Sequence, residues 1–133
     1  MPSWSGCIAS QTTSLKGGTS TSEVVINAAV PAKWFSNGVM ALRCTEGVSG
    51  SIFCDVYGAV GGATFLIGGV STITGAGNTI IPTDGVQANT ASATYPTTSG
   101  QQGFPRPSLV IFGTAGAVGV GYTASVYLAG EYC

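Results

Sequence analysis

The chain has 133 residues, the size of a single domain with one hydrophobic core. Charged residues make up only 7% of it, against about 25% in an ordinary soluble domain, and the formal net charge is −1. This balance gives no electrostatic basis for binding nucleic acid or an anionic membrane surface.

The sequence also lacks the features of several other function classes. It contains no histidine, the commonest general base and metal ligand, and its five acidic residues are scattered. No nucleophile elbow, phosphate-binding loop or acidic calcium loop is present. No apolar run is long enough for a membrane-spanning helix, and the N-terminus lacks the pattern of a signal peptide. We therefore expect a protein that is not an enzyme, binds no cofactor or metal, and is made in the cytoplasm.

The four cysteines are Cys7, Cys44, Cys54 and Cys133, and none forms a CxxC pair. Without histidine, a structural zinc site is not expected. Without a secretion signal, reduced thiols are the default. Disulfides Cys44–Cys54 or Cys7–Cys133 are the alternative if the chain reaches an oxidising environment.

Residues 1–22 are rich in Ser, Thr and Gly, with few apolar anchors. We expect an N-terminal arm here, either frayed or docked on a neighbouring molecule through Trp4. The remainder, residues 23–133, is predicted to form one β-sandwich domain.

Two strands are predicted at 39–44 and 51–57, joined as a hairpin through 45–50. A register with Cys44 opposite Cys54 also places Arg43 opposite Asp55, so one pairing satisfies the thiols, the charges and the apolar positions together. An earlier strand at 23–27 is closed by Pro31. Trp34 is interpreted as a core or sheet-edge residue, with a sugar-stacking platform as the alternative.

Short strands are also predicted at 63–67, 70–74 and 78–81, separated by glycine-rich turns. The following stretch, 82–107, is polar and carries four prolines that forbid regular pairing over most of it. Long irregular loops often carry function, which makes 82–107 the candidate contact surface. Phe104 and Arg106 are its predicted partner-binding residues. A proline-rich lead-in to the next strand is the structural alternative.

Strict alternation of apolar and polar residues over 120–128 predicts a half-buried strand. The apolar run 108–112 precedes it, and we interpret the two as an antiparallel hairpin with a long connection. No segment has helical periodicity. The chain is therefore predicted to be all-β, a single antiparallel β-sandwich, jelly-roll-like, or a small β-barrel.

The C-terminal pattern Phe104-Pro-Arg-Pro, Leu109-Val-Ile-Phe and Gly121-Tyr-Thr-Ala-Ser-Val-Tyr-Leu-Ala-Gly-Glu-Tyr132 resembles small virion proteins of tailed bacteriophages, in particular capsid decoration (cement) proteins. The resemblance covers about the last quarter of the chain. It implies a non-enzymatic β-sandwich or barrel, often trimeric, that sits where capsid subunits meet. No functional residue of that family transfers individually.

The low charge supports the same expectation, because symmetric assembly buries an otherwise adhesive surface. We predict a virion protein that forms a homo-oligomer, a trimer, and binds a lattice of the major capsid protein. A phage tail component is a close alternative. A carbohydrate-binding or adhesin domain that uses Trp34, Tyr57 or Tyr95 is a second alternative, and a hydrolase with an Asp/Glu pair is a third.

Overall fold

The computed structural model describes residues 2–13, 18–44, 49–73, 77–83, 87–88, 103–118 and 122–133, and these residues contain strands and no helix. None of them, accordingly, belongs to a helix that could cross a membrane. The strands are β1 (Ser3–Thr13), β2 (Gly18–Val25), β3 (Phe35–Cys44), β4 (Ser49–Val60), β5 (Ala63–Ile73), β6 (Gly77–Ile81), β7 (Gln87–Ala88), β8 (Pro107–Val118) and β9 (Tyr122–Tyr132).

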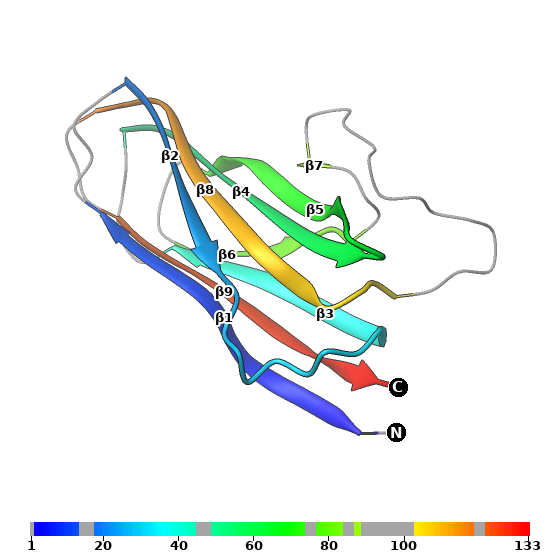
Figure 1. The fold of residues 1–133 in the computed structure, drawn as a ribbon. Coiled ribbons are helices and arrows are strands. Elements are labelled where there is room, and N and C mark those ends of the chain that lie inside the picture. Colours follow the sequence, from blue (N-terminus) through cyan, green and yellow to red (C-terminus); the bar gives the residue numbers. More distant parts are fainter. Residues whose placement is uncertain are drawn as a thin grey trace.

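The strands form two sheets that pack face to face (Figure 1). Sheet A has the order β1–β9–β3–β6, and sheet B has the order β2–β8–β4–β5–β7. The pairs β1–β9, β2–β8, β3–β6 and β4–β5 are all antiparallel, as if one long hairpin had been rolled up. This is the strand order of a jelly roll, which confirms the predicted all-β antiparallel sandwich.

The rolled topology overturns the hairpin predicted between 39–44 and 51–57. Strand β3 lies in sheet A and β4 in sheet B. Arg43 pairs with Asn78 and Ser125, whereas Asp55 pairs with residues of β5 and β8. The Arg43–Asp55 pairing was wrong because matched apolar alternation shows that two strands face one core, but not that they are neighbours in one sheet.

The hairpin predicted between 108–112 and 120–128 is wrong for the same reason. Strand β8 pairs with β2 and β4 in sheet B, while β9 pairs with β1 and β3 in sheet A. The alternation itself is confirmed, since Ala124, Val126 and Leu128 are buried in the core. Consecutive strands that do pair in a tight hairpin are β4 and β5, which turn at Gly61 and Gly62 with φ of +58° and +85°.

The N-terminal segment also differs from the expected arm. Strand β1 pairs with β9 from Ser3 to Thr13, with one irregularity between Cys7 and Ala9, and β2 already begins at Gly18. The segment is therefore an edge strand of sheet A. Its inward residue Ile8, only 1% exposed, contributes to the core.

Of the irregular stretch 82–107, residues 84–86 and 89–102 lie outside the described residues. Strand β7 within it pairs in parallel with β5. The last residues of the stretch 82–107, residues 103–107, lie against sheet A, where Phe104 forms an isolated bridge with Phe35.

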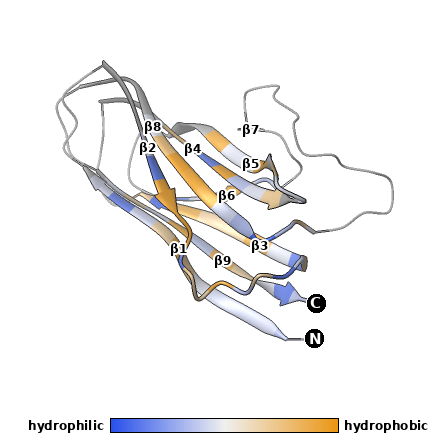
Figure 2. Cartoon of the chain, viewed as in Figure 1, coloured by the Kyte–Doolittle hydropathy of each residue, from blue (hydrophilic) through white to orange (hydrophobic). Residues whose placement is uncertain are grey.

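The core lies between the inner faces of the two sheets, and hydrophobic positions occur on strands of both (Figure 2). Cys44 and Cys54 are buried in it, Cys7 is half-buried and Cys133 is exposed. None of the four is in a disulfide in the structure. The largest fully buried side chains include three phenylalanines: Phe35, Phe104 and Phe112.

Candidate interaction surfaces

An apolar band crosses the outer face of sheet A. The registers of the four strands place Cys7, Tyr127, Ala41 and Ile80 in one row across the whole sheet. The next row adds Ala129 and Val39, which are paired with each other. We refer to these six residues as the apolar band. Ile80, Val39 and Tyr127 are 64%, 48% and 39% exposed, so the band places several exposed large hydrophobic side chains in adjacent rows.

Polar rows border the apolar band on both sides. On one side, Ser10 pairs with Ser125, which pairs with Arg43. The Ser10 and Ser125 hydroxyls are 2.9 Å apart, and a second hydroxyl pair, Thr12–Thr123, lies beyond them at 3.1 Å. Ser3, Glu131 and Asn37 form the row on the other side. An apolar centre with a polar rim is the usual composition of a protein–protein interface.

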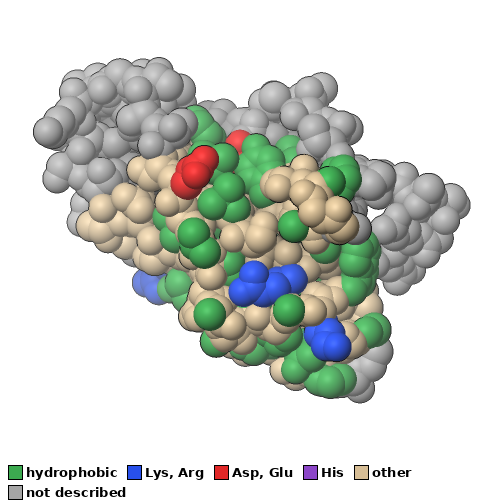
Figure 3. Space-filling model, viewed as in Figure 1, with side chains coloured by type: hydrophobic (Ala, Val, Ile, Leu, Met, Phe, Trp, Pro, Cys, Tyr) green, Lys and Arg blue, Asp and Glu red, His purple; other side chains and the backbone are tan. Residues whose placement is uncertain are grey.

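A shallow hollow lies within the apolar band. Its volume is about 240 Å³, and strands β1, β9 and β3 line it with Ser5, Gly6, Val39, Ala41, Tyr127, Leu128 and Ala129. Within the part of the chain that the structure describes, no charged side chain lines it. The visible face of the molecule in Figure 3 likewise carries its charged side chains as isolated spots among hydrophobic and uncharged polar atoms.

The open edge of β1 is protected near its centre. The Asn27 amide, just after β2, donates a hydrogen bond to the Ile8 carbonyl at 3.0 Å. This occupies one of the backbone groups that an edge strand otherwise presents to another chain. The bulge between Cys7 and Ala9 interrupts the same edge. The outer face of sheet A, more than this edge, is therefore the surface suited to association.

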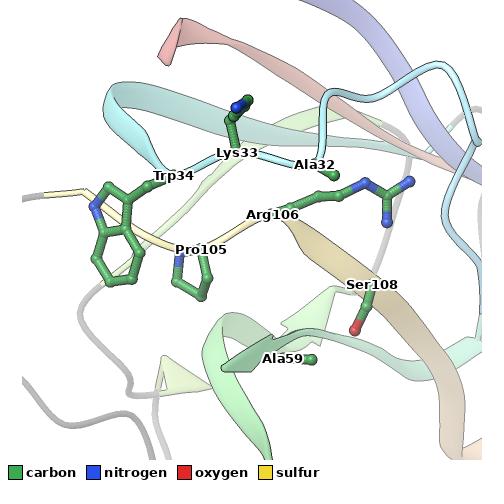
Figure 4. A pocket seen from close by; sticks show the side chains of 7 residues that line it. All are labelled: Ala32, Lys33, Trp34, Ala59, Pro105, Arg106 and Ser108. Atoms are coloured by element: carbon green, nitrogen blue, oxygen red, sulfur yellow. The ribbon is translucent and has the colours of Figure 1, made fainter. Parts of the chain in front are cut away.

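A second candidate surface is a cavity of about 360 Å³ at one end of the sandwich. Figure 4 shows the Trp34 indole and the Pro105 ring side by side at one end of it and the Arg106 side chain at the other. Ala59 and Ser108 lie below, and Lys33 extends from the rim away from Pro105. Two of the chain's four cationic residues therefore line this cavity, and none of the acidic residues that the structure describes does.

The Arg106 side chain is held by three backbone carbonyls. Its Nε donates to Val30 O at 3.0 Å, and its two terminal nitrogens donate to Pro107 O at 3.2 Å and Asn27 O at 3.1 Å. The guanidinium thus fixes the β2–β3 connection against the start of β8. Two of its five N–H donors are left for other partners.

The residues predicted to bind a partner have different environments in the structure. Phe104 has no exposed surface, so its ring serves the core of this chain and offers nothing to a partner. Arg106 is half-buried and makes the intramolecular contacts described above. Trp4 is half-buried on β1, with its indole over Gly6, so a partner contact by Trp4 stays a prediction.

The apolar band contains none of the three residues Trp4, Phe104 and Arg106. Sequence reasoning missed the band because its residues come from four strands that are distant in sequence. The band can be found only when the strand pairing is known, because Ala41 and Tyr127 become neighbours only through the β3–β9 register.

Two titratable groups near Asp55 have shifted pKa values. Burial raises the pKa of the Cys54 thiol well above its ordinary value of 9.0, and the negative charge of Asp55 adds to the shift. The pKa of Tyr57 is raised above 10.0 by burial and, to a smaller extent, by the same carboxylate. Cys54 is therefore a protonated core thiol and not a nucleophile at neutral pH.

Among the residues that the structure describes, no three Cys, Asp or Glu side chains gather as a metal site would require.

Comparison with known proteins found no match among protein-family models and none among curated protein sequences. Among solved structures, the chain is similar to part of an infectious bursal disease virus (Gx strain) structure, with 15% identity and a TM-score of 0.45 over 96% of this chain. It spans 31% of the length of that protein.

Two smaller proteins show similar values. The family 11 carbohydrate-binding module of a Clostridium thermocellum cellulase has 11% identity and a TM-score of 0.46, over 98% of this chain and 87% of the module. PirA has 9% identity and a TM-score of 0.45, over 90% of this chain and 93% of PirA. These values are too low to transfer a function, and the function proposed below rests on the chain's own residues.

Proposed function

We propose that this chain is a structural virion protein, a capsid decoration protein that associates with copies of itself and reinforces a capsid lattice. The observation that carries the proposal is the apolar band on the outer face of sheet A, with uncharged hydroxyl pairs along one border. Burying exposed apolar surface such as that of Ile80 and Val39 favours association, because it removes that surface from water.

The composition supports the same function. Only 7% of the residues are charged, so the chain has few of the charged side chains that keep a protein from associating. Interface centres are depleted in Lys, Glu and Asp, and the apolar band contains none of them. Many weak contacts repeated over a symmetric lattice add up through multivalency, so each contact need not be strong.

The resemblance to tailed-phage decoration proteins suggests the oligomeric state and the position on the capsid. These are a trimer and the place where major capsid subunits meet. A jelly roll by itself does not decide among functions, because the same strand order occurs in capsid and lectin domains. A tail component of the same particle remains the alternative closest to this proposal.

The test is sedimentation of the purified protein and of two single-arginine variants. Ile80→Arg places a charge in the apolar band, where Ile80 is 64% exposed. Val25→Arg is the matched control, because Val25 is 80% exposed on β2, the edge strand of the other sheet. We expect the wild type and Val25→Arg to sediment as the same oligomer and Ile80→Arg to sediment as a monomer.

Co-sedimentation then tests where in the virus particle the protein sits. The binding partners are capsid shells and tails, each purified from the phage that encodes the protein. We expect the wild type and Val25→Arg to pellet with shells. A wild-type protein that sediments as a compact monomer and pellets with neither particle contradicts the proposal, and pelleting with tails alone favours the tail alternative.

A further inference from the structure

The cavity at the end of the sandwich has the chemistry of a ligand site, and the assembly role does not use it. We propose that it binds a sugar ring that carries a carboxylate, with the ring against Trp34 and Pro105 and the carboxylate near Arg106 and Lys33. The cavity volume of about 360 Å³ lies within the range of about 300–1,000 Å³ that is typical of small-molecule sites.

The apolar side of the cavity suits the face of a pyranose ring. Trp34 is half-buried and lines the cavity, so the residue keeps exposed surface there. Pro105 beside it is buried and rigid, and it packs within reach of Gly58 on β4. A rigid aromatic and a proline lose little conformational entropy on binding, which favours a weakly held ligand such as a sugar.

The opposite side of the cavity suits a negative charge. Arg106 keeps two N–H donors beyond the three that hold Val30, Asn27 and Pro107 carbonyls. Because those three bonds fix the guanidinium in place, its free donors are already oriented before a ligand arrives.

Lys33 supplies a second, mobile cation at the rim, since its side chain is exposed and carries a flexible four-carbon stem. Among the described residues, no acidic side chain lines the cavity, so none of them repels a carboxylate there. A neutral sugar leaves both cations unused, and a simple carboxylate leaves the indole unused. The ligand that uses both sides therefore has a ring and a charge in one unit.

Nuclear magnetic resonance of the two tryptophan indole N–H groups gives a direct test. The chain has only Trp4 and Trp34, so the spectrum contains one reporter in the cavity and one on β1 as an internal control. Trigalacturonate is the probe, galactotriose is its neutral counterpart, and acetate supplies a carboxylate without a ring.

We expect trigalacturonate to shift the Trp34 signal to saturation at millimolar concentration while the Trp4 signal stays in place. Lys33→Gln should weaken binding about twofold to fivefold and reduce its salt dependence, because it removes an exposed cation. Trp34→Ala removes the reporter, so its binding is followed by the heat of titration with trigalacturonate, which should vanish. Trp4→Phe should leave the shift of the Trp34 signal unchanged.

Several results would overturn the proposal. They are an unmoved Trp34 signal at 10-fold higher probe concentration, equal binding of galactotriose and trigalacturonate, or equal affinity of the wild type and Lys33→Gln. A Trp34 shift with acetate as strong as that with trigalacturonate would also overturn it, since the site would then recognise an anion without a ring. None of these outcomes depends on the oligomeric state or on capsid binding.

Discussion

Phe35 and Phe104 join the two sheets of the sandwich at a single bridge. Their backbones exchange two hydrogen bonds, of 2.8 and 2.9 Å, and their rings stack with centroids 5.7 Å apart. Both side chains have no exposed surface. The bridge brings the segment before β8, a strand of sheet B, against the first residue of β3 in sheet A, and so closes one end of the core.

Gly103 makes this bridge possible. It has φ of +83°, and a Cβ atom there would overlap the Phe35 carbonyl. Gly61 has a similar φ of +58° in the β4–β5 turn, but open space surrounds the position of its Cβ. The two glycines share a backbone requirement and differ in their neighbours, which gives a matched pair of substitutions.

We expect Gly61→Ala to lower the free energy of unfolding by about 1–2 kcal/mol, from the backbone conformation alone. Gly103→Ala should cost about 1–3 kcal/mol more, since Phe35 must also move. Urea denaturation of both variants measures the difference. Equal losses would mean that the Phe35–Phe104 bridge adjusts without cost.

Arg106 is expected to stabilise the β2–β3 connection. Replacing it with Lys keeps the charge but cannot reproduce three hydrogen bonds to Val30, Asn27 and Pro107 carbonyls. Because the side chain is only half-buried, we expect Arg106→Lys to reduce the free energy of unfolding by about 1–3 kcal/mol.

The exposed Arg43 on β3 is the control, and Arg43→Lys should change the free energy of unfolding by less than about 0.5 kcal/mol. Hydrogen exchange supplies a second readout. The Asn27 amide, which donates to Ile8, should exchange faster in Arg106→Lys than in Arg43→Lys. Unchanged exchange would show that the connection holds without the guanidinium.

The sequence was sufficient to predict the all-β class and most strand positions. Alternation of apolar residues correctly identified the inward side chains of β3 and β9, such as Met40, Leu42 and Val126. Alternation records only whether a side chain faces the core. It carries no information on which sheet holds the strand, and the core of a sandwich is shared by both.

Strand pairing was therefore the part that could not be predicted. A short connection such as 45–48 favours a hairpin between its flanking strands, as do turn residues such as Gly113 and Gly116. In a jelly roll, connections of the same kind cross from one sheet to the other, as between β3 and β4. The apolar band followed from pairings such as Tyr127 with Ala41 and Cys7, which no local pattern specifies.

Alkaline pH should destabilise the fold through Cys54 and Tyr57. Both groups have folded-state pKa values raised above the ordinary 9.0 and 10.0, by burial first and by Asp55 second. Above pH 9 the unfolded chain therefore releases protons that the folded chain retains, so the free energy of unfolding falls as pH rises. The slope for a fully protected group approaches about 1.4 kcal/mol per pH unit, and the partly exposed Tyr57 contributes less.

Urea denaturation at pH 8, 9, 10 and 11, with reductant to keep the thiols free, measures this dependence. We expect little change from these two groups between pH 8 and 9 and a progressive loss above it. Tyr57→Phe should reduce the slope above pH 10, and Asp55→Asn should reduce it slightly above pH 9, because burial is the larger cause of both pKa shifts and the carboxylate the smaller. A slope in Asp55→Asn equal to that of the wild type would show that burial alone, without the neighbouring charge, sets the alkaline limit of stability.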